Sequence, residues 1–265
     1  MSSFSSSAIL LRRIDHGDYD LILSIFTLNK GKVSIIAKSA KKSVKRFSGI
    51  LELFSVLDIV CSTGRGRGLP ILQEATLKVP FSKIRADIRK TAYASYWVEL
   101  ISAWMEEGEK NHQLYHLLQY VLEELDSGQR SEEALSVLFQ MRLLAMAGLG
   151  PNLKECCICR IELEKIKVSR VNTDLVKGGL ICDSCVTGGF GRICLSKGTI
   201  KQLSWLESGD LNKAARIRFN PQALKESLEF LETFVPYHLG SEPRSLKFLR
   251  QIRRQGMERS ANRHV

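Results

Sequence analysis

The sequence predicts an α+β chain of several domains, in which a small N-terminal β-barrel precedes an α-helical domain that a cysteine-rich element interrupts. Three observations lead to this fold class. Short strand-like segments separated by turn residues fill about the first eighty residues, and helical apolar spacing begins only after them. Four of the seven cysteines then form two C-x-x-C pairs in the middle of the helical part. A chain of 265 residues has room for two or three small domains.

The N-terminal segments 1–80 read as strands of a small barrel. β-branched and aromatic residues dominate, and His16-Gly17-Asp18 and Asn29-Lys30-Gly31 supply turns between them. The expected strands are 8–14, 19–28, 32–38, 49–61 and 69–79. Five strands without a long helix fit an OB-fold, a small five-stranded barrel that binds oligonucleotides. An SH3-like barrel would give the same pattern, so periodicity alone leaves both open.

The helical domain is expected in two parts, 81–150 and 195–254. Apolar residues recur every four positions from Ile84 to Met105, which predicts one helix there. Further helices are predicted at 112–125, after the N-cap Ser131, and at 221–235 behind Asn220. A short basic amphipathic segment at 245–254 follows, and residues 255–265 are expected to form a basic flexible tail.

The interrupting element, 151–194, carries a metal-binding pattern. Cys156 and Cys159 form one pair, and Cys182 and Cys185 form a second pair, with 22 residues between the pairs. Two thiolates three residues apart can reach one ion, and two such turns complete a tetrahedron. Four thiolates leave no open coordination position, so the sequence predicts one structural Zn²⁺. Cys157 is an alternative to Cys156 as a ligand, and a set of buried free cysteines is the alternative to a metal site.

Glycines and the remaining cysteines complete this interpretation. Gly178-Gly179 and Gly188-Gly189 flank the second pair and allow the unusual backbone of metal-binding turns. Cys61 and Cys194 are expected to be spare thiols.

The net charge of +11 is unevenly distributed. Residues 1–90 hold 16 Lys and Arg against 7 Asp and Glu, and residues 241–265 hold 7 against 2. Residues 91–240 hold 16 against 19. Clustered positive charge of this kind predicts a surface that binds a polyanion.

The densest cluster lies between the third and fourth predicted strands, where a connection can border a nucleic-acid groove. Cations there contact phosphates and release counterions, which gives affinity without sequence specificity. Two arginines in the turn 64–68 are expected to assist. Phe47 and Phe54 are available to stack bases or to fill the core. The predicted DNA-binding residues are Lys38, Lys41, Lys42, Lys45, Arg46, Arg65 and Arg67.

Other function classes have no support in the sequence. His112 and His116 lie four apart but lack the acidic neighbour of a metalloprotease motif, so a solvated helix face is the simpler interpretation. No carboxylate pair or nucleophile–base pair stands out, and the protein is not expected to be an enzyme. No stretch is long enough to span a bilayer, and the start lacks the features of a signal peptide, so we expect a cytoplasmic protein.

With the barrel, helices and cysteines in this order, the sequence resembles the RecO family of bacterial recombination mediators. The matching stretches are DYDLILSIFTLNKGKVSIIAKSAKK, RFSGILELFSVLDIV, the two cysteine pairs with their Gly-Gly, and SLKFLRQI near the end. The resemblance implies an N-terminal OB-fold, a helical domain and a four-cysteine zinc element. It also implies binding of single- and double-stranded DNA, annealing of complementary strands and association with the bacterial nucleoid.

The resemblance further implies the partners. RecO-like proteins act with RecR to load RecA onto DNA coated by single-strand-binding protein, whose acidic C-terminal tail they contact. The alternative function is a zinc-containing RNA-binding or ribosome-associated OB-fold module, because a basic barrel would serve either nucleic acid.

Overall fold

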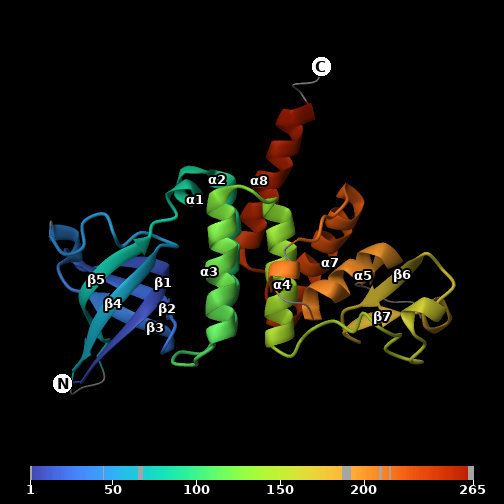
Figure 1. Cartoon of the computed structure of the whole chain (residues 1–265), viewed down its shortest axis with the longest axis horizontal. Coiled ribbons are helices and arrows are strands. Elements are labelled where there is room, and N and C mark those ends of the chain that lie inside the picture. The colour runs from blue at the N-terminus through green and yellow to red at the C-terminus, as the bar shows by residue number, and fades with distance from the viewer. Residues whose placement is uncertain are drawn as a thin grey trace. The chain divides into compact units, whose positions relative to one another are not determined.

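The computed structural model describes residues 2–43, 45–64, 68–186, 192–208, 211–214 and 216–261. The chain forms two compact units (Figure 1). The first unit combines Met1–Gln129 with Pro243–Val265, and the second unit is Arg130–Glu242. The C-terminal segment therefore belongs to the same unit as the barrel. None of the described helices is long and apolar enough to cross a membrane.

Five strands of the first unit close into a barrel in the order β1-β2-β3-β5-β4. β1 pairs antiparallel with both β2 and β4, which closes the barrel, and β3 meets β5 in parallel at Ile36 and Ile71. This is the Greek-key order of an OB-fold rather than a simple meander. The predicted fold class, an N-terminal OB-like barrel followed by helices and a cysteine element, is confirmed. The strands are β1 (Ser2–His16), β2 (Asp20–Thr27), β3 (Gly31–Ala37), β4 (Val56–Thr63) and β5 (Ile71–Val79).

Two strand predictions were wrong in their extent. β1 begins at Ser2 instead of residue 8, because its polar start is paired along β4 from the Ser2–Thr63 pair onwards. The predicted strand 49–61 forms only from Val56, since Gly49 and Phe54 adopt positive φ angles of 70° and 72° that a strand does not tolerate.

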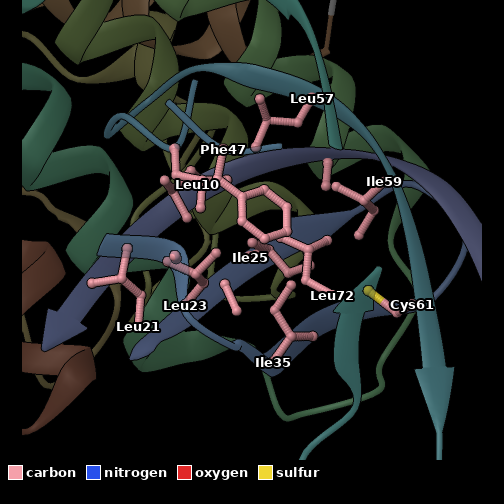
Figure 2. Packing of buried hydrophobic residues seen from close by; sticks show 14 residues of the cluster. Leu10, Leu21, Leu23, Ile25, Ile35, Phe47, Leu57, Ile59, Cys61 and Leu72 are labelled. Carbon is pink, nitrogen blue, oxygen red and sulfur yellow. The ribbon is translucent and has the colours of Figure 1, made fainter. Parts of the chain in front are cut away.

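The barrel core is built from side chains of all five strands together with Phe47 from the basic connection (Figure 2). The Phe47 ring is 3 % exposed and lies among residues such as Leu10, Ile25 and Leu57. Burial of a phenylalanine ring contributes about 2–3 kcal/mol. Of the two interpretations of Phe47 and Phe54, the structure supports core packing for both, because Phe54 is also buried.

Among the described residues, the first unit also contains the helices α1 (Ser82–Ala86), α2 (Ile88–Trp104), α3 (His112–Ser127) and α8 (Arg244–Ala261). The single helix predicted from residue 84 to 105 is broken at Asp87, whose extended backbone starts α2. Its carboxylate accepts hydrogen bonds from the backbone N–H groups of Arg89 and Lys90, and such a cap stabilises a helix start by about 1 kcal/mol. α8 continues to Ala261, beyond the point at which a flexible tail was expected.

The helices of this unit are fixed to the barrel by specific contacts. The Tyr115 hydroxyl of α3 hydrogen-bonds the Ser7 hydroxyl at 3.1 Å, and its ring lies 5.8 Å from that of Phe26. The segment between α2 and α3 also pairs with β3 through a bridge between Lys32 and Glu107. The barrel, α2 and α3 are thus held together by hydrogen bonds as well as by apolar packing.

The second unit contains helices α4, α5, α6 and α7 and a three-stranded sheet in the order β7-β6-β8. The sheet and two 3-10 turns occupy the cysteine-rich element, where the sequence shows no helical stripe. α7 starts as predicted, with Asn220 as cap and Pro221 in the first turn. The elements are α4 (Glu132–Met146), η2 (Leu163–Lys165), β6 (Arg170–Asp174), β7 (Gly179–Ile181), η3 (Asp183–Cys185), β8 (Arg192–Ser196), α5 (Lys197–Ser208), α6 (Leu211–Ala214) and α7 (Pro221–Leu239).

Candidate metal centre and nucleic-acid interface

Four cysteine sulfurs converge in the second unit. The Sγ atoms of Cys156, Cys159, Cys182 and Cys185 all lie within 4.8 Å of one another, and those of Cys159 and Cys182 are 3.6 Å apart. A tetrahedral zinc–thiolate site with Zn–S distances of about 2.3 Å has sulfurs about 3.8 Å apart. The donor set and its spacing therefore fit a metal ion of the zinc type.

The two cysteine turns are brought together by backbone pairing. Arg160, with a φ of 62°, closes the first turn by donating its N–H to the Cys156 carbonyl oxygen at 3.0 Å. The Cys185 N–H closes the second turn on the Cys182 carbonyl at the same distance. The Cys157 N–H donates to the carbonyl of Leu180 on β7, which holds one turn beside the strand that leads into the other.

Gly179 allows the close approach behind this site. A Cβ atom at Gly179 would lie 2.3 Å from the carbonyl oxygen of Asn152, closer than any side chain tolerates. Gly178 adopts a φ of 72°, which also favours glycine. The second predicted glycine pair, Gly188-Gly189, lies outside the described residues.

The electrostatics of the four thiols favour a cation. Burial opposes ionisation of Cys156, but backbone N–H groups of Cys159, Cys182 and Ile158 donate to its sulfur and lower the pKa of the thiol from 9.0 to about 6. Hydrogen bonds with the neighbouring Cys159 and Cys182 instead raise the pKa of Cys185 to about 12. A thiolate cluster of this kind resists full ionisation unless a bound cation compensates its charge.

The other cysteines lie apart from this group. Cys157 follows Cys156 in the chain but is not among the four converging sulfurs, so the structure brings Cys156 to the site. Cys61 is in the barrel core, where burial raises the pKa of its thiol to about 12. Cys194 is on β8.

The cysteine element is fastened to the helices of the same unit by Glu226 of α7. Its carboxylate accepts hydrogen bonds from the Arg170 guanidinium at 2.6 Å, the Ser196 N–H at 2.9 Å and the Thr199 hydroxyl at 2.6 Å. The Gln222 side chain donates a fourth at 3.1 Å. Arg170 is on β6 and Ser196 ends β8, so one buried carboxylate connects two strands and the start of α5. Glu226 could not be recognised from the sequence, because its partners lie up to 56 positions away in the chain.

The basic connection after β3 forms a compact structure against the β1–β2 hairpin. It begins with the 3-10 turn η1 (Ala40–Lys42), and the Lys41 N–H donates to the Tyr19 carbonyl at 3.0 Å. The Lys41 ammonium pairs with Asp15 at 3.1 Å, and the Lys42 ammonium lies 3.3 Å above the ring centre of Tyr19. The structure therefore places the predicted cations at the hairpin between β1 and β2, one of the loops with which OB-folds contact oligonucleotides.

The remaining predicted cations are distributed around this turn. Lys38 and Lys45 are exposed, and the Arg46 guanidinium lies 4.9 Å from the ring centre of Phe47. Arg65 and Arg67 lie outside the described residues, in the connection between β4 and β5. That connection is the second loop with which OB-folds bind oligonucleotides.

A hollow of about 410 Å³ opens between β1, η1 and the segment that follows the basic connection. Its charged lining is already paired, with Arg13 3.1 Å from Glu52 and Lys41 3.1 Å from Asp15. The other side chains that line the hollow are serine hydroxyls and apolar groups. The cations beside the hollow, rather than the hollow itself, offer contacts to an anion.

Tyr19 is the functional candidate that sequence analysis missed. It is 45 % exposed, although tyrosine is usually more buried, and it carries the Lys42 ammonium on its ring. An exposed ring beside cations is the combination that binds single strands, because bases stack on the ring while cations hold the phosphates. The available signal was a tyrosine directly after the turn His16-Gly17-Asp18.

The histidine pair does not join the metal site. His112 and His116 are exposed on α3, and the His116 ring packs against Tyr115 with centroids 5.6 Å apart. This agrees with the interpretation as a solvated helix face.

Comparison with known proteins identifies the family. The model described as "Recombination protein O N terminal" matches residues 1–81, and the model "Recombination protein O C terminal" matches residues 85–247. The chain is 44 % identical to the DNA repair protein RecO of Desulfosudis oleivorans over 96 % of this chain and 99 % of that protein. It is 43 % identical to the DNA repair protein RecO of Desulfatibacillum aliphaticivorans, over 96 % of this chain and 99 % of the relative.

A more distant relative covers the same length. The DNA repair protein RecO of Syntrophus aciditrophicus is 32 % identical over 97 % of this chain and 98 % of its own. The OB-like barrel and the four-cysteine element thus occur in a chain that is related to these proteins from end to end. The chain belongs to the RecO family of DNA repair proteins.

Proposed function

We propose that this chain is a non-enzymatic recombination mediator that binds single- and double-stranded DNA and anneals complementary strands. With RecR, it helps to load RecA onto DNA coated by single-strand-binding protein, whose acidic C-terminal tail it contacts. It acts in the bacterial cytoplasm, at the nucleoid. Family membership supports this function, and the single structural observation that carries it is the group of cations gathered at Tyr19 on the barrel.

The barrel binds DNA through phosphate contacts and base stacking. Lys42 and Tyr19 form one surface at the β1–β2 hairpin, with Lys38, Lys45 and Arg46 around it. Lys41 belongs to the same turn, and Arg65 and Arg67 assist from the β4–β5 connection. Contacts of this type read no base sequence, as a mediator that acts on any single strand requires.

A strand-annealing assay tests the function. Complementary oligonucleotides are coated with single-strand-binding protein, and the rate of duplex formation is measured with and without the protein. We expect faster annealing, and the absence of any acceleration would contradict the proposal. A competition between RNA and single-stranded DNA of equal length separates the proposal from an RNA-binding module, which would prefer RNA.

The contribution of the barrel cations is tested by Lys41→Ala combined with Lys42→Ala. Loss of two phosphate contacts lowers the slope of log affinity against log salt by about 2 for every DNA sequence. The matched control, Lys110→Ala with Lys177→Ala, removes two exposed lysines elsewhere and should leave the slope unchanged. Equal slopes in the two variants would refute the assignment of these lysines.

Zinc in this protein is structural. The four cysteines Cys156, Cys159, Cys182 and Cys185 would hold one ion in a closed tetrahedron, in which no position remains for a substrate or for water. Elemental analysis of purified protein should find about one zinc per chain. Fully folded protein without any metal would refute the assignment.

A further inference from the structure

The helix α8 presents a cationic face to solvent, which we call the outer face of α8. Arg244, Lys247, Gln251 and Arg254 recur at three- and four-residue intervals and are all exposed, so they lie along one side of the helix. Phe248 is on the same side and is 41 % exposed. No Asp or Glu occurs between residues 244 and 257.

Contacts with α2 fix the orientation of this face. Leu246 and Leu249 on the opposite side of α8 are fully buried. The Glu99 carboxylate accepts hydrogen bonds from the Arg244 N–H at 3.1 Å and the Ser245 N–H at 2.8 Å. Further along α8, the Arg253 guanidinium lies 6.0 Å from the ring centre of Tyr93. The start of α8 thus meets the later residue Glu99 of α2 and its middle meets the earlier residue Tyr93, so the two helices run antiparallel. The helix is therefore docked on α2 in one orientation, with its cationic side turned outward.

A second helix extends the positive surface. The Arg89 guanidinium of α2 lies 3.6 Å from the position that a Cβ atom would take at Gly256. Arg89 is itself half-buried. Positive side chains therefore continue from the middle of α8 towards its C-terminal end. A row of exposed cations on one side of a helix attracts a polyanion.

We propose that the outer face of α8 binds the phosphate backbone of a second nucleic-acid strand, in addition to the strand held by the barrel. The inference rests on the proposed function of DNA binding by the barrel. Arg244 to Arg254 span about 15 Å of helix, roughly the axial length of four phosphates on one strand of a duplex. Phe248 lies within this row and offers a ring on which a base stacks.

The same cations fit a strand better than an acidic peptide. A peptide tail would need an apolar pocket for its side chains beside the charges. Among residues 244–256, Phe248 is the one large apolar side chain exposed on α8. A linear row of cations matches a linear row of phosphates.

Two strand-binding surfaces on one compact unit account for the proposed annealing without any chemical step. The barrel and α8 both belong to the first unit, so strands bound to them are held at a high local concentration. Complementary strands then meet more often than they do free in solution. Neither surface needs to recognise a base sequence.

The experiment is a stoichiometric titration at low salt with a dye-labelled oligothymidylate too short to reach both surfaces. Wild-type protein should bind about two oligonucleotides per chain, and Lys247→Ala combined with Arg254→Ala should bind about one. The control Lys110→Ala with Lys177→Ala should still bind about two, as should the charge-conserving pair Lys247→Arg and Arg254→Lys. Far-UV circular dichroism and the melting temperature confirm that each variant is folded.

The outcomes separate the two proposals. A wild-type chain that binds one oligonucleotide, or an α8 variant that still binds two, overturns the second site. If the α8 variant instead loses binding of a dye-labelled acidic peptide and keeps both oligonucleotides, the face is a peptide site and the proposal is wrong. If the chain binds two oligonucleotides but does not speed annealing, the second site stands and the proposed annealing function fails.

Discussion

Replacement of Glu226 by Gln should destabilise the second unit, and by more than replacement of the exposed Glu229 on the same helix α7. The Glu226 side chain is 8 % exposed, and it accepts hydrogen bonds from Arg170, Ser196, Thr199 and Gln222. A glutamine places an N–H₂ group where one of these donors now points. One donor is then unsatisfied in a buried position, and the ion pair with Arg170 is lost.

The expected loss of folding free energy follows from the pKa of Glu226. Burial disfavours the charged form, but hydrogen bonds from Thr199, Ser196, Gln222 and Arg170 outweigh it and lower the pKa from 4.5 to about 2. At 1.36 kcal/mol per pH unit, the ionised carboxylate stabilises the folded state by about 3 kcal/mol near neutral pH. For a unit of this size that corresponds to a lowering of the melting temperature by about 10 °C.

The sign of the pH dependence is fixed by the depressed pKa. The folded carboxyl holds its charge at a lower pH than the unfolded one, so the contribution is complete above about pH 4.5 and lost as the pH falls through 2. At pH 3 about half of it remains, roughly 1.4 kcal/mol. The difference in stability between wild type and Glu226→Gln should therefore shrink by about half between pH 7 and pH 3.

Calorimetric melting of the full chain at both pH values measures this difference. The control is Glu229→Gln, an exposed carboxylate on the same helix, which should change the melting temperature by no more than a degree or two. A difference between wild type and Glu226→Gln that is the same at pH 3 and pH 7 would refute the electrostatic explanation. No difference at pH 7 would refute the assignment of Glu226 as the connection between sheet and helices.

Three further predictions concern the metal centre and the barrel. Cys182→Ser should abolish zinc in elemental analysis and lower the melting temperature, while oligonucleotide affinity at the barrel stays within about two-fold, because the site is structural. Gly31→Ala should cost more than about 1–2 kcal/mol in denaturant titration, since Gly31 has a φ of 67° and a Cβ atom there would lie 1.9 Å from the Glu109 carbonyl oxygen. Tyr19→Leu should weaken single-strand binding roughly ten-fold in fluorescence anisotropy without a change in melting temperature, because the Tyr19 ring is exposed. Its counterpart Phe47→Leu should lower the melting temperature by several degrees, because the Phe47 ring is buried in the barrel core.

The sequence was sufficient for features that depend on short-range pattern. Alternating segments predicted β2, β3 and β5 to within a few residues, because one face of each strand is buried. The cysteine pairs were visible for a similar reason, since each pair is a local turn of four residues. Their convergence needed the approach of Asn152 to Gly179, which the spacing permitted but did not specify.

Long-range contacts account for what the sequence could not predict. The polar start SSFSSS has no strand-like alternation, and it is a strand because β4 offers a partner along its whole length. Apolar spacing continues across Asp87, so the break between α1 and α2 is visible only through the capping hydrogen bonds. Tyr19 and Glu226 became candidates only once folding placed Lys42 and Arg170 beside them.

The folded structure reduces the mutual repulsion of the cations in the basic connection after β3. Five cations within nine residues would repel one another along an extended chain, but the structure gives three of them separate surroundings. Lys41 pairs with Asp15, Lys42 lies on Tyr19 and Arg46 lies beside the Phe47 ring. The exposed ion pair between Lys41 and Asp15 contributes at most about 1 kcal/mol, so a DNA phosphate can take the place of Asp15. Because that ion pair is lost when the phosphate binds, Lys41 adds less to the binding free energy than a cation without an ion pair would. Lys42 forms no ion pair with the described carboxylates, so a phosphate that it binds displaces none of them. A base stacked beside Tyr19 brings its phosphate within reach of the same ammonium. The affinity of the barrel for a single strand should therefore depend more on Lys42 than on Lys41, although the two are neighbours of equal charge.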